Sequence, residues 1–134
     1  MDRFLDFKKN MNDQRKYHAM FFSIDKFVLE EQVKAFYPKN FFSDVNPTEF
    51  FIFTDSNIWC FIENMDATEI ILYKNFEVEK LKLVRANNQR QIEAKLEIHL
   101  KSGEQILLSP NDEANVDWKD TFITYIEKIF DLLV

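Results

Sequence analysis

Few side chains in this sequence are suited to chemistry, and the first to consider is Cys60, the only cysteine. It lies within the apolar run of residues 58–62, which contains no cation. A reactive cysteine needs a nearby positive charge to stabilise its thiolate. We therefore expect Cys60 to be a buried apolar residue. One cysteine also excludes an intrachain disulfide and a multi-cysteine metal site.

The two histidines, His18 and His99, are the next candidates for a metal ligand or a general base. They are far apart in the sequence and lie in segments of different character. His99 alternates with apolar neighbours, which predicts a position on the solvent-facing side of a strand together with Lys95 and Glu97. A lone histidine without an orienting partner is weak evidence for catalysis. We expect neither histidine to be a ligand or a base.

The acidic stretch of residues 111–120 superficially resembles a calcium-binding loop. Such a loop needs a central glycine for its sharp turn and a bidentate glutamate at its end, and this stretch has neither. We interpret it as a solvated loop that caps the last helix.

Gly103 is the only glycine in the chain. Phosphate-binding loops and nucleophile elbows need several glycines, so the GxGxxG, GxxxxGK and GxSxG motifs are all excluded. The sequence predicts no catalytic, cofactor-binding or metal-binding residues and no cofactor. We expect a protein that is not an enzyme.

A group of cations is predicted along neighbouring strands, and glutamates interleave with it. Because the two charges alternate, we expect cross-strand ion pairs on a solvated face rather than an anion-binding site. The cations are Lys80, Lys82, Arg85, Arg90 and Lys95, and the glutamates are Glu77, Glu79, Glu93 and Glu97.

The 134 residues suit a single domain, and a 46% hydrophobic content is enough to form a core. The net charge of −6 disfavours binding to nucleic acid or to anionic lipid. The N-terminus lacks the apolar core of a signal sequence, and no apolar run could span a bilayer. These features predict a cytoplasmic protein with no membrane anchor.

The first 45 residues have mostly helical spacing. Apolar residues between positions 4 and 11 predict one helix, and a stripe of Leu29, Val33 and Phe36 predicts a second over residues 25–37, ended by Pro38. Residues 17–24 fit a helix or a strand equally well.

From Pro47 onward, short apolar runs separated by polar turns predict antiparallel strands over residues 50–54, 58–63, 69–73, 76–85, 92–100 and 105–108. Residues 55–57 and 102–103 are predicted hairpin turns. Apolar residues on either side of Glu79 and Lys80 are out of phase, which predicts a bulge there. A final amphipathic helix is predicted over residues 117–133, with Asp117 as its N-cap.

Three segments resemble bacterial pleckstrin-homology-like domains, a group similar to GRAM domains and found in small protein families of Bacillus-type bacteria. Residues 51–58 are similar to the family's element of two apolar strands joined by a Thr-Asp turn, with Ser56 in place of the usual basic residue. Residues 71–78 are similar to its Ile-Pro-Tyr-x-x-Ile-x-x-Val stretch, with Leu72 in place of proline and one residue fewer before Val78. Residues 95–106 and 118–129 resemble its closing hairpin and capping helix.

The resemblance implies a strongly bent antiparallel sheet that the C-terminal helix closes at one end. The family's first strand has three possible positions here: residues 17–22, the neighbourhood of Phe41 and Phe42, or none. We therefore predict an α+β fold, with a partial barrel over residues 46–134 and a helical N-terminal extension, residues 1–45, packed on it.

The strand runs of residues 50–53 and 58–62 are apolar on both faces. Either the first 45 residues cover the second face, or that face is an interface in a homodimer or with another partner. We expect a non-enzymatic binding module with a protein partner. One alternative is a small-ligand protein or enzyme with a pocket between the N-terminal helices and the sheet. Another is an acidic inhibitor of the immunity type.

Overall fold

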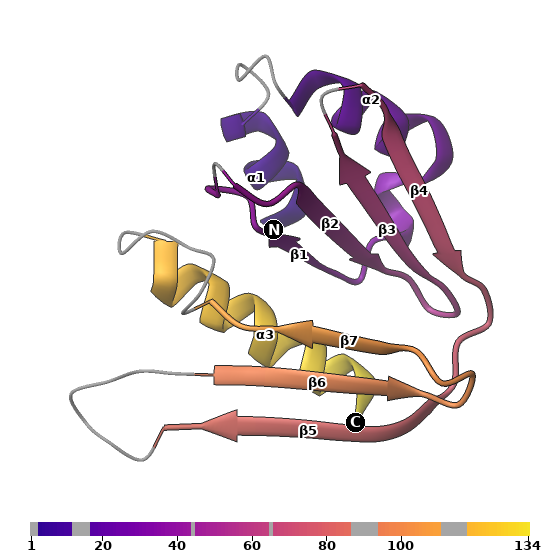
Figure 1. Cartoon of the computed structure of the whole chain (residues 1–134), viewed down its shortest axis with the longest axis vertical. Helices are drawn as coiled ribbons and strands as arrows, with labels where there is room; N and C mark the ends of the chain where they lie inside the picture. The colour runs from indigo at the N-terminus through magenta and orange to yellow at the C-terminus, as the bar shows by residue number, and fades with distance from the viewer. Residues whose placement is uncertain (1–2, 12–16, 44, 65, 87–93, 111–117) are drawn as a thin grey trace.

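The computed structural model describes residues 3–11, 17–43, 45–64, 66–86, 94–110 and 118–134 (Figure 1). Within these ranges it has three α-helices, α1 (Arg3–Met11), α2 (His18–Phe27) and α3 (Lys119–Leu133), and a short 3₁₀ helix, Glu30–Gln32. Two separate antiparallel sheets accompany the helices. The predicted α+β class is therefore confirmed.

The first sheet has the strand order β1-β2-β3-β4 and the second has the order β5-β6-β7, so each is a simple meander. Figure 1 shows the two sheets as separate layers, with α1 and α2 beside the first sheet and α3 next to the second. The strands of the first sheet are β1 (Ala35–Lys39), β2 (Thr48–Phe53), β3 (Ile58–Glu63) and β4 (Thr68–Tyr73). Those of the second are β5 (Val78–Arg85), β6 (Ala94–Leu100) and β7 (Gln105–Leu108).

The predicted helix over residues 25–37 is wrong. Residues 17–24, which were ambiguous, belong largely to α2, and the first strand is β1, at none of the three expected positions. Ala35 and Tyr37 pair with Phe53 and Phe51 of β2. The stripe that favoured a helix thus ends in a strand buried on both faces, which local periodicity does not separate from a helix. Residues 1–45 are correspondingly not all helical.

Pro38 was expected to end a helix and instead lies inside β1. Thr54 donates its N–H to the carbonyl of Asn57, and hydrogen-bonded pairs alternate along an antiparallel ladder. Phe50, the residue opposite Pro38, therefore directs its N–H and C=O toward β3. The missing N–H of Pro38 costs no ladder bond, which is why an edge strand accepts it.

Aromatic rings join the N-terminal helices to the first sheet. The rings of Phe4, Phe7 and Phe21 lie 6.1, 5.9 and 6.0 Å from the ring of Phe50. On the opposite face of the sheet, Tyr37 lies 5.4 Å from Phe122 of α3. Other parts of the same chain thus contact both faces, and this explains why β2 is apolar on both sides.

Helix α3 contacts both sheets, through β1 in the first and through β5 and β6 in the second. Its buried stripe includes Phe122, Ile126 and Ile129, each fully inaccessible to solvent. The predicted helix is confirmed over Lys119–Leu133, whereas its proposed cap, Asp117, lies outside the described residues.

Two local predictions about the strands are confirmed. The register of β5 on β6 shifts between Val78 and Lys80, as expected for a bulge. Gly103 forms the turn between β6 and β7 with a φ of +103°, a conformation that residues with a side chain rarely adopt, and it donates its N–H to Leu100.

Candidate functional site

Cys60 is buried in β3 with 2% of its surface exposed. Burial raises the pKa of its thiol to about 12, so the group stays protonated at neutral pH. A protonated, inaccessible thiol is a poor nucleophile. The buried position expected from the sequence is confirmed.

His99 lies on the partly exposed side of β6, next to Glu97, with 3.2 Å between its Nε2 and the Glu97 Oε1. His18 lies at the start of α2, so the two histidines belong to different elements. Among the residues in the described ranges, no three His, Cys, Asp or Glu side chains are grouped closely enough to hold a metal ion.

Two cations of β5 contact carboxylates, and one of these contacts, between Lys82 and Glu97, is a cross-strand ion pair of the predicted kind. The Lys82 Nζ lies 3.8 Å from the Glu97 Oε2, and Arg85 reaches Glu127 of α3 at 3.4 Å. Arg90 and Glu93 lie outside the described residues, as does most of the acidic stretch that resembles a calcium loop, residues 111–117.

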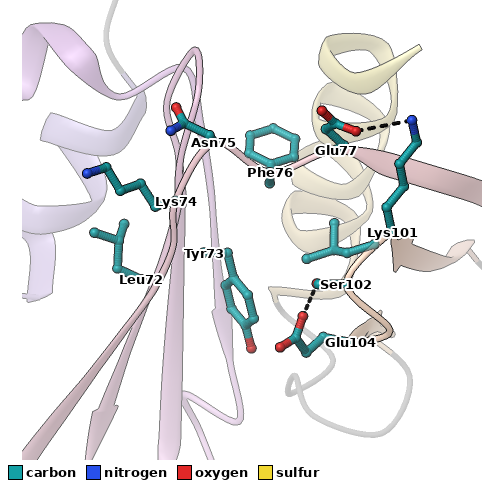
Figure 2. Close-up of a pocket in the computed structure, with 10 residues that line it drawn as sticks. Leu72, Tyr73, Lys74, Asn75, Phe76, Glu77, Lys101, Ser102 and Glu104 are labelled. Atoms are coloured by element: carbon teal, nitrogen blue, oxygen red, sulfur yellow. Dashed lines mark hydrogen bonds and ion pairs between the residues drawn. The ribbon is translucent and has the colours of Figure 1, made fainter.

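A hollow of about 360 Å³ lies where the connection from β4 to β5 meets the β6–β7 hairpin (Figure 2). The Lys101 Nζ lies 3.1 Å from the Glu77 Oε2, and Ser102 donates a hydrogen bond to Glu104. Burial raises the pKa of Tyr73, and the Glu104 carboxylate adds to this rise, so the phenol is a hydrogen-bond donor at neutral pH. Two pairs of polar side chains in the hollow, Lys101 with Glu77 and Ser102 with Glu104, therefore contact each other.

The outer edge of β4 is a more distinctive feature. Three consecutive aliphatic residues there, Ile70, Ile71 and Leu72, are each about 40% exposed (39, 40 and 40%). β4 is the last strand of its sheet, and none of the strands in the described ranges pairs with its outer side. In Figure 1 it lies at the margin of the first sheet.

The direction of the β4 backbone follows from one hydrogen bond. Asn64 donates its N–H to the carbonyl of Ala67, so these two residues form a hydrogen-bonded pair. From this pair, hydrogen-bonded and non-hydrogen-bonded pairs alternate along the ladder between β3 and β4. The N–H and C=O groups of Thr68, Ile70 and Leu72 therefore point away from β3. We call these outward groups, together with the side chains of Ile70, Ile71 and Leu72, the β4 edge.

Aromatic residues lie next to the β4 edge on one face of the sheet. Leu72 pairs across the ladder with Trp59, and the Trp59 ring stacks against Phe27 of α2 with 6.4 Å between ring centres. Leu72 and Tyr73 point to opposite sides of the strand (Figure 2). Leu72 therefore extends the apolar surface formed by Trp59 and Phe27, whereas Tyr73 lies on the other face.

Sequence reasoning identified residues 69–73 as a strand but did not recognise it as an edge. The missed signal is the run Ile70-Ile71-Leu72, which breaks strict alternation in a strand next to polar turns. Likewise, several residues lining the hollow of Figure 2 were assigned to strands, and no site was predicted there.

Comparison of the chain with protein-family models, with curated proteins and with solved structures gives no match. None of the described helices is both long enough and apolar enough to cross a lipid bilayer.

Proposed function

We propose that this chain is a non-enzymatic protein-interaction module and that the β4 edge is its interaction surface. The observation that carries the proposal is an unpaired strand edge with three exposed aliphatic side chains. Such an edge accepts another strand, because main-chain hydrogen bonds supply affinity and alternate side chains supply specificity.

The other strand edges carry features that oppose pairing. Helix α3 contacts β1, which also contains Pro38. β5 carries Lys80, Lys82 and Arg85 together with a bulge. β7 has four residues, and the Lys39 Nζ donates a 3.0 Å hydrogen bond to the carbonyl of its Leu107. Charge, proline, bulges and short length are the usual protections of an edge. β4 carries one exposed charge, Glu69, and contacts α2, but it has no proline and no bulge, and three consecutive aliphatic residues lie at its centre.

The pleckstrin-homology-like assignment remains part of this proposal. What supports it is the chain order of four antiparallel strands, three antiparallel strands and a C-terminal helix, together with the sequence resemblance. A single, buried cysteine supports a cytoplasmic location, since reducing compartments do not require disulfides.

The alternative of a ligand pocket between the N-terminal helices and the sheet has less support. Packed aromatic rings occupy that interface, with Phe36 stacked on Phe50 at 5.8 Å and Phe4 at 5.4 Å from Phe36. The hollow of Figure 2 lies elsewhere, and four of its polar side chains pair with one another, Lys101 with Glu77 and Ser102 with Glu104.

Photo-crosslinking in the native host tests the proposal. A photoreactive amino acid replaces Leu72 in one variant and Val84 in the control, because both residues are exposed aliphatics on edge strands. We expect Leu72 to yield covalent adducts with protein, whether with another copy or with a different chain, and Val84 to yield few. Equal yields at both positions, or no protein adduct at Leu72, would contradict an interaction surface on β4.

A further inference from the structure

We infer that the occupant of the β4 edge is a second copy of this chain, paired antiparallel about a two-fold axis at Ile70. The β1–β4 sheet of one copy then joins the β1–β4 sheet of the other copy to form one continuous sheet. This inference rests on the proposed function and names the partner.

The backbone limits how two such edges can pair. Outward-facing residues of one copy must oppose outward-facing residues of the other, and these are Thr68, Ile70 and Leu72. An antiparallel pair centred on Ile70 meets this requirement. It places Ile70 opposite Ile70 and Thr68 opposite Leu72, so the aliphatic centre of each edge is covered.

Charge selects this register over its neighbours. Asp66 precedes β4 and Lys74 follows it, both exposed and each four positions from Ile70. Antiparallel pairing centred on Ile70 therefore brings Asp66 of each copy beside Lys74 of the other, which gives two opposite-charge pairs by symmetry. A register centred on Glu69 would instead oppose two like charges. A register centred on Ile71 would place Lys74 opposite Thr68 and Asp66 opposite Phe76, so it would form neither of these opposite-charge pairs.

Two alternatives lack this complementarity. Parallel pairing of β4 edges in register would place Asp66 beside Asp66 and Lys74 beside Lys74. Self-pairing of β5, the other long edge strand, in a register centred on Lys80, Leu81 or Lys82 would bring its cations together. Like charges directly opposite destabilise a ladder, whereas the β4 pair centred on Ile70 brings unlike charges together.

Sedimentation velocity on the full chain over a range of concentrations tests the inference. We expect a reversible monomer–dimer equilibrium. Ile70→Lys opposes two cations at the two-fold axis and should raise the dimer dissociation constant at least about tenfold. Val84→Lys places the same charge at an exposed aliphatic position of β5 and should leave the constant unchanged.

A charge exchange tests the register. Lys74→Asp and Asp66→Lys should each weaken the dimer by about tenfold, and the double variant should restore it. Asp66 and Lys74 lie beyond opposite ends of β4, whose 6 residues span about 20 Å, so they do not contact each other within one copy. Restoration therefore reports a contact between copies.

A chain that stays monomeric at every concentration would overturn the inference, as would equal weakening by Ile70→Lys and Val84→Lys. Failure of the double variant to restore the dimer would overturn the register. If the chain is monomeric but Leu72 crosslinks to a different protein, the proposed interaction module stands. Only the inference that a second copy occupies the β4 edge is then wrong. If Leu72 crosslinks to no protein, the proposed function fails as well.

Discussion

Cys60 keeps its proton because its surroundings in β3 are apolar. The folded thiol has a pKa of about 12, whereas the ordinary value is 9.0. The unfolded chain therefore releases this proton first as the pH rises. The contribution of the protonated Cys60 thiol to the free energy of unfolding is fully present below pH 9.0. It is lost progressively between that value and about pH 12.

We predict that Cys60→Ala reduces the alkaline loss of stability. In the wild type this group lowers the free energy of unfolding by up to about 1.4 kcal/mol for each pH unit above its unfolded pKa. The alanine variant keeps every other titrating group, so its slope should be shallower by that amount, even though its stability at neutral pH is lower because of the cavity. Urea unfolding at a series of alkaline pH values measures both slopes. Equal slopes would contradict the raised pKa.

At the next scale, β4 depends on the alternation of its backbone groups. Ile70 and Ile71 have almost the same exposure, but only Ile71 directs its N–H toward β3, where it opposes Cys60. The two residues are equivalent in composition and differ only in the direction of one N–H.

Proline substitution separates these two positions. Ile70→Pro removes an outward N–H and should lower the free energy of unfolding by about 1 kcal/mol or less, whereas Ile71→Pro breaks a ladder bond and should cost about 3 kcal/mol. Urea unfolding at concentrations that keep the chain monomeric measures both values. Ile70→Ala and Ile71→Ala correct for the lost side chains. Equal losses for the two prolines would show that the assigned backbone direction is wrong.

Several elements could be predicted because their signals are local. The strands Ile58–Glu63 and Gln105–Leu108 have the predicted bounds, since polar turns flank each apolar run. Helix α2 also carried a readable signal, because Tyr17, Met20, Phe21, Ile24 and Val28 recur at helical spacing and all are buried. The competing stripe from Leu29 to Phe36 obscured it.

For the whole molecule, the packing of α3 against both sheets is decisive. Phe122 contacts Tyr37 of the first sheet, and α3 also contacts β5 and β6 of the second. The buried residues of both sheets and of α3 belong to one hydrophobic cluster, so we expect the chain to unfold as one unit.

The two tryptophans report on this cooperativity. Trp59 lies in the first sheet, and Trp118 lies at the start of α3, 5.5 Å from Phe42. Trp118→Phe and Trp59→Phe each leave a single tryptophan. The urea unfolding curve followed by tryptophan fluorescence is compared with the curve followed by circular dichroism for the same variant. We expect fluorescence and circular dichroism to give the same urea midpoint within each variant. Different midpoints would show that parts of the molecule unfold separately.

By itself, the sequence determined the α+β class, the final helix, most strand positions, the turn at Gly103 and the bulge in β5, because hydrophobic period and turn chemistry act over a few residues. It also excluded glycine-rich phosphate loops and nucleophile elbows. Only the tertiary structure decided that residues 35–39 form a strand and that β4 lies at the margin of its sheet. Strand order depends on contacts between distant residues, such as Ala35 with Phe53, and an edge is defined by the absence of a neighbour among the described strands, which local spacing does not encode.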